Sequence, residues 1–266
     1  MLLWLVGAPL IAYLAILLFL YAFQRELLYF PDTSRPFFAG LPLIGVREAT
    51  LHTADRLPLL AWYLAPPEGR PVILYFHGNG GSIAYRATRL MRFAHDGYGV
   101  LMPEYPGYGG NPGGPSEAGL YATAAAALDF LRQEGIDGRR LVLYGESLGS
   151  AVAVQAAMTT PIAALVLESP FTSIAAVAQH HYPYVPATLL VWDRFDSLSR
   201  IGGVKAPMLF LQGGSDRVVP PRFGQALFDV APQPKERWVA PDAGHEDLAQ
   251  FGALDAVADF IARHVH

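Results

Sequence analysis

Short apolar segments alternate with longer helical segments along most of this chain, and this alternation is what most constrains its fold. Several short segments are apolar at every position and bounded by Gly or Pro, as is typical of strands covered on both faces. The predicted strands span residues 46–51, 59–64, 72–76, 100–104, 141–144, 164–167, 208–211 and 237–240. The predicted helices span residues 82–95, 116–134, 148–159, 221–230 and 246–265. The alternation predicts an α/β domain over residues 46–266, with a mostly parallel central sheet of about eight strands flanked by helices.

The first 23 residues form a separate apolar segment. None of them carries a charged side chain, and only Gly7 and Pro9 fall outside the hydrophobic residue types. As a helix, such a segment would extend roughly 33 Å, enough for a hydrocarbon core of about 30 Å. A cleaved signal peptide would need a basic start and small residues at its exit, whereas the exit reads YAFQ at residues 21–24. We therefore expect residues 1–23 to form a single-pass transmembrane anchor.

The segment after this anchor differs from both its neighbours. Residues 24–45 are interrupted by Pro and Gly and show neither helical nor strand periodicity, which predicts an irregular connector. Arg25 and Arg35 follow the apolar segment, while only the α-amine precedes it. By the positive-inside rule, this arrangement favours a globular domain on the cytoplasmic side of a membrane.

The composition excludes several classes of protein. With 52% hydrophobic residues, the chain has too much apolar surface to bury for a disordered protein. Nineteen Lys and Arg against 23 Asp and Glu leave no basic excess for binding nucleic acid. The chain has no Cys, which rules out disulfides, thiolate zinc sites and a cysteine nucleophile. No spacing typical of metal ligands occurs either, so no metal is expected.

The sequence GESLG at residues 145–149 matches the GxSxG pattern of a serine nucleophile. A predicted strand precedes it and a predicted helix rich in small residues follows it, which is the context that this pattern requires. In such a turn the serine adopts a strained positive-φ conformation at the head of a helix, and the flanking glycines avoid collisions with neighbouring backbone. Ser147 is therefore the candidate nucleophile.

A serine hydroxyl needs a base to take its proton, and the base needs an acid to orient it. In this kind of sheet the two partners follow the serine in the order acid, histidine. Asp216 lies in the turn after the predicted strand at 208–211, and His245 lies in the loop after the next strand. Glu168, at the end of the strand after the nucleophile helix, is the main alternative acid. We expect Ser147, Asp216 and His245 to form a catalytic triad.

Two backbone N–H groups are expected to stabilise the oxyanion formed during acyl transfer. One belongs to Leu148, the residue after the nucleophile. The other should come from the loop HGNGGS at residues 77–82, where Asn79 is the candidate donor. This loop lacks the GxGxxG and GxxxxGK[ST] patterns that hold phosphates.

The motifs HGNGGS, GESLG, SDRVVP and AGHEDL, in this order, resemble those of α/β-hydrolase-fold serine hydrolases. Together with EYPGYG at residues 104–109 and the apolar N-terminus, the chain is similar to the membrane-anchored hydrolase-domain proteins, a branch that includes lysophospholipid lipases and protein depalmitoylases. The resemblance implies an acyl-enzyme mechanism without a cofactor. It assigns catalysis to Ser147, Asp216 and His245, and the amide donors to Asn79 and Leu148.

Substrate contacts are expected from an insertion between two strands. Residues 169–201 would form a small helical cap over the site, and its apolar side chains could line an acyl pocket. The expected substrate-binding residues are His77, Gly78, Tyr105, Phe171, Tyr182 and Trp192. The predicted activity is hydrolysis of acyl esters or thioesters, with a lipid or lipidated substrate. The alternatives are an inactive hydrolase fold that only binds ligands, and an acyltransferase that uses the same triad.

Overall fold

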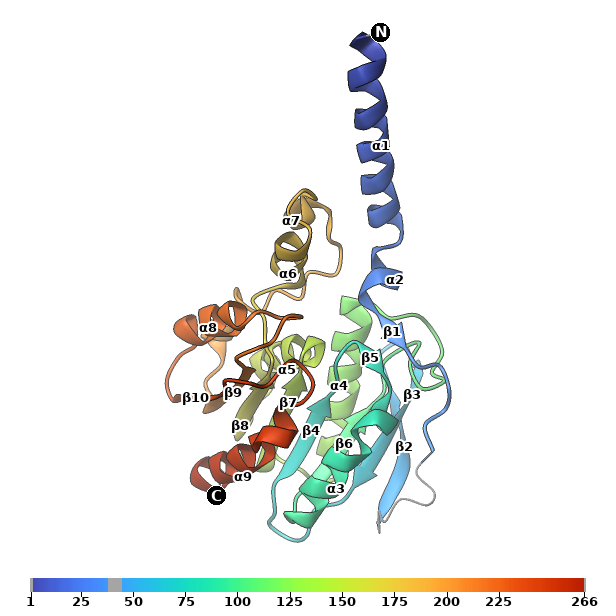
Figure 1. The fold of residues 1–266 in the computed structure, drawn as a ribbon. Helices are drawn as coiled ribbons and strands as arrows, with labels where there is room; N and C mark the ends of the chain where they lie inside the picture. The colour runs from blue at the N-terminus through green and yellow to red at the C-terminus, as the bar shows by residue number, and fades with distance from the viewer. Residues whose placement is uncertain (1, 38–44, 266) are drawn as a thin grey trace.

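The computed structural model describes residues 2–37 and 45–265 and contains an eight-stranded sheet (Figure 1). The order of its strands across the sheet is β10-β9-β8-β7-β4-β6-β3-β2. Strand β3 runs antiparallel to both neighbours, and every other neighbouring pair is parallel. The strands are β2 Val46–His52, β3 Pro58–Leu64, β4 Val72–Phe76, β6 Gly99–Pro103, β7 Leu141–Glu146, β8 Ala164–Glu168, β9 Met208–Gly213 and β10 Lys235–Ala240. All eight predicted strands are confirmed.

Helices cover both faces of this sheet (Figure 1). Apolar side chains of α4 (Glu117–Gln133), α5 (Leu148–Thr159) and α8 (Pro221–Val230) belong to one core cluster. Side chains of α3 (Ala87–His95) and α9 (Ala253–His264) belong to the other. Alternate residues of β4 contribute to the two clusters, because successive side chains of a strand point to opposite faces. The remaining short 3₁₀ helices are η1 Ile83–Arg86, η2 Gly138–Arg140, η3 Ile201–Gly203 and η4 Leu248–Phe251.

The segment after the N-terminal helix is not irregular throughout, so the predicted connector is wrong over residues 24–31, whereas residues 32–37 have no helix or strand. It contains the short helix α2 (Gln24–Leu28) and the strand β1 (Phe30–Pro31). Strand β1 pairs in parallel with β5 (Gly80–Gly81) to form a second, two-stranded sheet. Local periodicity could not reveal β1, because its hydrogen-bond partners lie some 50 residues away in sequence. Residues 38–44 of the predicted connector lie outside the described residues.

Helix α1 (Leu2–Ala22) projects away from the domain (Figure 1). Many apolar side chains of its described part, such as Ile11, Ile16 and Leu18, are exposed. Within the part of the chain that the structure describes, no helix is both long and apolar enough to cross a membrane. The transmembrane anchor predicted for residues 1–23 is therefore not confirmed, and Met1 lies outside the described residues.

The insertion between β8 and β9 carries two helices, α6 (Ile174–His181) and α7 (Ala187–Leu190), beside α2 and above the carboxyl ends of the strands (Figure 1). We refer to residues 169–201 as the cap. Its α6 end contacts the domain, because the carbonyl of Val218 lies 2.9 Å from Nε2 of His181. The cap therefore adjoins the edge of the sheet at which the predicted site residues are found.

Candidate active site

Ser147 stands in the turn between β7 and α5 with a φ of 51°, a conformation that is strained for a residue with a side chain. The two glycines of the motif make this turn possible. A Cβ atom on Gly145 would lie 2.3 Å from the carbonyl oxygen of Gly149, and one on Gly149 would lie 2.1 Å from the carbonyl oxygen of Phe76. No side chain fits at either position, so the turn takes the tight form expected from the sequence.

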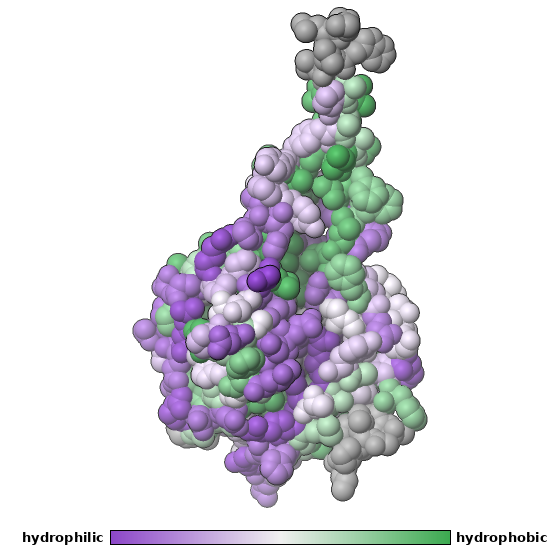
Figure 2. Space-filling view, viewed as in Figure 1, coloured by the Kyte–Doolittle hydropathy of each residue, from purple (hydrophilic) through white to green (hydrophobic). Residues whose placement is uncertain are grey.

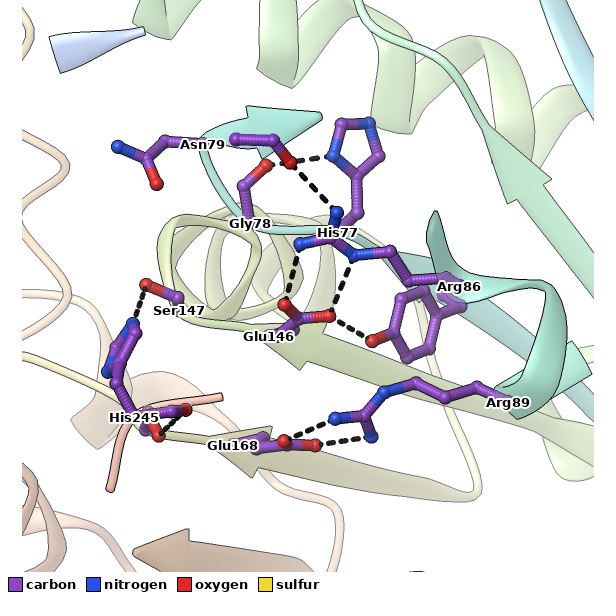
Figure 3. Close-up of polar contacts among 12 residues, drawn as sticks. His77, Gly78, Asn79, Arg86, Arg89, Glu146, Ser147, Glu168 and His245 are labelled. Carbon is purple, nitrogen blue, oxygen red and sulfur yellow. Dashed lines mark hydrogen bonds and ion pairs between the residues drawn. The ribbon is translucent and has the colours of Figure 1, made fainter. Parts of the chain in front are cut away.

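Three side chains from separate loops form a continuous hydrogen-bonded line. Nε2 of His245 lies 2.9 Å from Oγ of Ser147 (Figure 3), and its Nδ1 lies 2.7 Å from Oδ2 of Asp216. The other carboxylate oxygen of Asp216 accepts hydrogen bonds from the backbone N–H groups of Val218 and Val219, at 2.9 and 2.8 Å. Because β7, β9 and β10 are parallel, their carboxyl ends carry these residues to one edge of the sheet.

The environment of His245 favours its protonated form. Burial of the ring lowers the pKa of His245, but the hydrogen bond and the negative charge of Asp216 outweigh burial and raise this pKa above its ordinary value. The Asp216 side chain is fully buried and the His245 side chain is 11% exposed, so solvent screens their attraction only weakly. A carboxylate in this position stabilises the imidazolium form of the ring.

Glu168, the alternative acid, has a different set of partners. Its carboxylate is buried and forms two hydrogen bonds with the guanidinium of Arg89, at 2.6 and 2.8 Å, and accepts another from the hydroxyl of Tyr144. Its backbone carbonyl accepts the N–H of Ser147 at 2.8 Å. The geometry therefore places Asp216, and not Glu168, beside His245.

The loop of residues 77–79 lies next to Ser147 (Figure 3). A Cβ atom on Gly78 would lie 3.5 Å from the Cβ of Ser147. The carbonyl of Asn79 accepts hydrogen bonds from the N–H of Phe30 and the hydroxyl of Tyr108, and its Nδ2 donates to the carbonyl of Leu28 at 2.7 Å. These bonds fix the backbone of the residue predicted to donate to the oxyanion. They also show that the loop is held by the segment from α2 to β1, which the sequence did not indicate.

The second predicted donor is the N–H of Leu148. Leu148 is the first residue of α5, and the first N–H groups of a helix have no acceptor within the helix. Its side chain is buried in the core cluster below the site. The oxyanion roles of Leu148 and Asn79 remain predictions.

A largely buried ion pair, which the sequence did not indicate, lies beside the turn of Ser147 (Figure 3). Arg86 donates to the carboxylate of Glu146, with its NH2 nitrogen 2.7 Å from Oε1, and its NH1 nitrogen donates to the carbonyl of Gly80 at 2.8 Å. The hydroxyl of Tyr75 donates to the same carboxylate. Although burial opposes ionisation, Arg86 keeps the pKa of Glu146 below its ordinary value. The guanidinium of Arg86 therefore links Glu146, the residue before Ser147, to Gly80, the residue after Asn79.

Comparison with known proteins identifies the family. Residues 71–191 match the family model described as the alpha/beta hydrolase fold. The Arabidopsis thaliana alpha/beta hydrolase domain-containing protein WAV2 is 33% identical over 80% of this chain and 77% of its own length. The chain belongs to the α/β-hydrolase family.

Other relatives of this α/β hydrolase match nearly its whole length. An uncharacterized protein of Mycobacterium tuberculosis is 40% identical over 92% of this chain and 90% of its own. An uncharacterized membrane protein of Saccharomyces cerevisiae is 30% identical over 91% and 90%. Among solved structures, an esterase of Pyrococcus furiosus superposes with a TM-score of 0.70 at 19% identity, over 90% of this chain and 99% of that one, which shows that the fold is shared.

The residues predicted to contact substrate in this α/β hydrolase are divided between the core and the surface. His77, Tyr105 and Phe171 are buried. The Tyr105 hydroxyl donates to the carbonyl of His77 at 3.0 Å, so Tyr105 supports the loop that begins at His77. Tyr182 and Trp192 are exposed on the cap. Gly78 lies against Ser147, since a Cβ atom at this position would be 3.5 Å from the Cβ of Ser147.

A polar cavity lies beside the site of this α/β hydrolase. It is lined by β1 and the residue after it, β5, η1, α3, the end of β7 and the loop of His245. The lining residues are Phe30, Pro31, Asp32, Gly80, Gly81, Tyr85, Arg86, Arg89, Glu146 and Glu246. Among the described residues, no cluster of three or more His, Asp or Glu side chains is arranged to hold a metal ion.

Proposed function

We propose that this protein is a serine hydrolase that cleaves carboxylic ester or thioester bonds of acyl substrates. The observation that carries the proposal is the line of hydrogen bonds from Ser147 through His245 to Asp216. Each role in a nucleophilic acyl transfer then has a residue: Ser147 as the nucleophile, His245 as the general base and Asp216 as the group that orients the base. Esterases among the structures that share its fold are consistent with this reaction class.

The proposed reaction proceeds in two halves. Nε2 of His245 takes the proton of Ser147 as its Oγ attacks the acyl carbonyl carbon, and the tetrahedral oxyanion is held by the N–H groups of Asn79 and Leu148. The imidazolium then gives its proton to the leaving alcohol or thiol, which departs and leaves an ester on Ser147. In the second half, His245 takes a proton from water as the water attacks this ester. Collapse of the second tetrahedral intermediate releases the carboxylic acid and returns the proton to Oγ of Ser147.

We further propose that α1 anchors this activity at a membrane, with residues 1–23 as the anchor and 46–266 as the hydrolase domain capped by residues 169–201. Two observations support the anchor. Described side chains of α1, such as Leu10 and Leu14, expose apolar surface that water disfavours. The yeast relative is called a membrane protein. The arginine at position 25, just after the helix, favours a cytoplasmic domain. Partitioning of the full-length chain between carbonate-washed membranes and supernatant tests this anchor, and recovery in the supernatant would exclude it.

The catalytic proposal is tested with a fluorophosphonate probe and a panel of p-nitrophenyl esters and acyl thioesters on the detergent-solubilised full-length chain. The wild type should be labelled and should release free acid, and Ser147→Ala should lose both properties. Ser199→Ala, at an exposed position of the cap, is the matched control and should retain them. Absence of labelling in the wild type would identify an inactive fold that only binds ligands. Transfer of the acyl group to an alcohol in preference to water would identify an acyltransferase.

A further inference from the structure

An apolar groove runs between the cap and the N-terminal segment. One wall comes from the end of α1 and from α2, and the other comes from α6, α7 and the chain between and after them. The groove is narrow and open on one side, with a cavity volume of about 160 Å³. Its lining residues are Leu20, Tyr21, Gln24, Arg25, Leu27, Leu28, Ile174, Ala178, Tyr182, Val185, Ala187, Leu190, Val191 and Asp193.

Polar contacts along one edge hold the two walls at a fixed separation. Gln24 donates from Nε2 to the carbonyl of Leu190 at 3.3 Å and accepts the N–H of Trp192 at 2.7 Å. Arg25 forms an ion pair with the buried carboxylate of Asp193 at 2.9 Å, and the hydroxyl of Tyr29 donates to the same carboxylate at 3.0 Å. These bonds pair the polar groups at the edge of the groove with one another, so they are not available to a ligand. The apolar side chains of the two walls are left facing the space between them.

One lining residue of the groove, Leu28, is hydrogen-bonded to the loop beside Ser147. Leu28 and Ile174 line the groove and pack against the main core cluster of the domain. The carbonyl of Leu28 also accepts the side-chain hydrogen bond of Asn79, and Asn79 follows the glycine that touches Ser147. The groove therefore ends at the loop on which an acyl carbonyl would be held.

We propose that this groove binds the aliphatic chain of the acyl group, so that the N-terminal segment 20–28 forms one wall of the substrate site. This inference rests on the proposed ester hydrolysis. The two charges of the groove, on Arg25 and Asp193, neutralise each other and offer no site to a charged ligand. The walls are mostly Leu, Ile, Val and Ala side chains, whose surfaces suit an extended hydrocarbon chain. The polar cavity near β5 remains for the alcohol or thiol part of the substrate.

The outer end of the groove leads to the apolar surface of α1. Leu20 and Tyr21 line the groove, and exposed apolar side chains continue along the helix beyond them. Figure 2 shows these apolar side chains running along the projecting helix down to its base. A hydrocarbon chain entering the groove from this side stays in contact with apolar surface throughout its path. The chain length of the substrate should therefore matter to the reaction rate.

The test narrows the groove and compares substrates of different chain length. Ala178 lies on α6 in the groove wall and is half-buried, so Ala178→Trp places an indole in the path of the chain. Each methylene excluded from an apolar site weakens binding about fourfold, so the ratio of kcat/KM for p-nitrophenyl dodecanoate to that for the acetate should fall by about tenfold or more. Ala125→Trp, at an exposed position of α4, is the matched control and should keep the wild-type ratio.

Two further measurements keep the outcome decisive. Ala178→Leu is a smaller change for α6 to tolerate and should lower the same ratio by less than Ala178→Trp. Covalent labelling of Ser147 by fluorophosphonates does not require turnover. The ratio of labelling rates for a long-chain and a short-chain probe should rank the variants in the same order as the ester ratio. If acetate is hydrolysed but the ratio is equal in the wild type, both Ala178 variants and the control, the groove does not bind the acyl chain. If no ester is hydrolysed and Ser147 is not labelled, the proposed hydrolysis itself is wrong.

Discussion

Nε2 of His245 lies 2.9 Å from Oγ of Ser147, although 98 positions separate the two residues in the chain. They meet because Ser147 directly follows β7 and His245 follows β10, and these parallel strands end at the same edge of the sheet. The hydrogen bond therefore depends on the arrangement of the parallel strands as well as on the turn at Ser147. The other ring nitrogen of His245, Nδ1, lies 2.7 Å from Oδ2 of Asp216.

Asp216→Asn should abolish most of the ester hydrolysis without unfolding the protein. The amide nearly matches the carboxylate in size, but it can no longer stabilise the imidazolium and can hold the ring in the wrong tautomer. We expect kcat to fall by about 10³–10⁴-fold. Steady-state kinetics with p-nitrophenyl acetate gives the rate, and circular dichroism checks the fold. Asp242→Asn, on the exposed part of the same loop as His245, is the control, and an equal loss there would remove the special role of Asp216.

The rate of hydrolysis should depend on the protonation of His245. Because Asp216 raises the pKa of this imidazole above its ordinary value of about 6.5, the base is protonated and inactive over a wider acidic range. We expect kcat/KM to fall as the pH is lowered, with a half-maximal point above about pH 6.5. A profile of kcat/KM against pH in constant ionic strength measures this point. A flat profile down to pH 4 would show that no histidine acts as the base.

The ion pair of Arg86 and Glu146 should contribute to both stability and rate. Arg86→Met leaves a nearly buried carboxylate without its partner, which typically costs about 3–5 kcal/mol in the free energy of unfolding. It also removes the donor to the carbonyl of Gly80 and so loosens the loop beside Ser147. We expect kcat to fall together with stability.

The double variant Arg86→Met/Glu146→Gln separates the two effects. It removes the unpaired charge, so urea denaturation should show that much of the stability returns. The hydrogen bond to Gly80 stays lost, so kcat should remain low. Full recovery of kcat would mean that Arg86 serves stability alone. Arg139→Met breaks an exposed ion pair with Asp137 and is the control, for which we expect little change in either quantity.

Much of the fold, and the meeting of Ser147, His245 and Asp216, were predictable from the sequence. The central strands were predictable because they are apolar at successive positions and lie next to Gly or Pro. Ser147 and His245 were predictable because the GxSxG turn and the order of the loops restrict which residues can meet. A Cβ atom added at Gly145 or Gly149 would come within 2.3 Å of a backbone oxygen, and this need for glycine is visible in the sequence as a motif.

The remaining parts of the site depend on contacts between segments that are distant in sequence. Strand β1 exists because Phe30 and Asp32 donate to the loop of Asn79, and nothing in the residues around them indicates that partner. The burial of His77, Tyr105 and Phe171 could not be predicted either, since aromatic residues near a site can serve as its lining or its support. Arg86 and Glu146 are both charged, and their burial becomes apparent only when the two elements that carry them are packed together.

The contact between Asp193 and the N-terminal segment should control the mobility of the cap. Asp193→Ala removes the partner of both Arg25 and Tyr29, and hydrogen bonds to charged groups typically contribute about 1.5–3 kcal/mol. We expect backbone amides of α6 and α7 to exchange with solvent about tenfold faster or more, while those of α5 keep their protection. Hydrogen exchange followed by mass spectrometry of cap peptides measures the effect. Glu48→Ala, which breaks the exposed ion pair with Arg35, should leave cap exchange unchanged, and unchanged exchange in Asp193→Ala as well would show that this contact does not hold the cap.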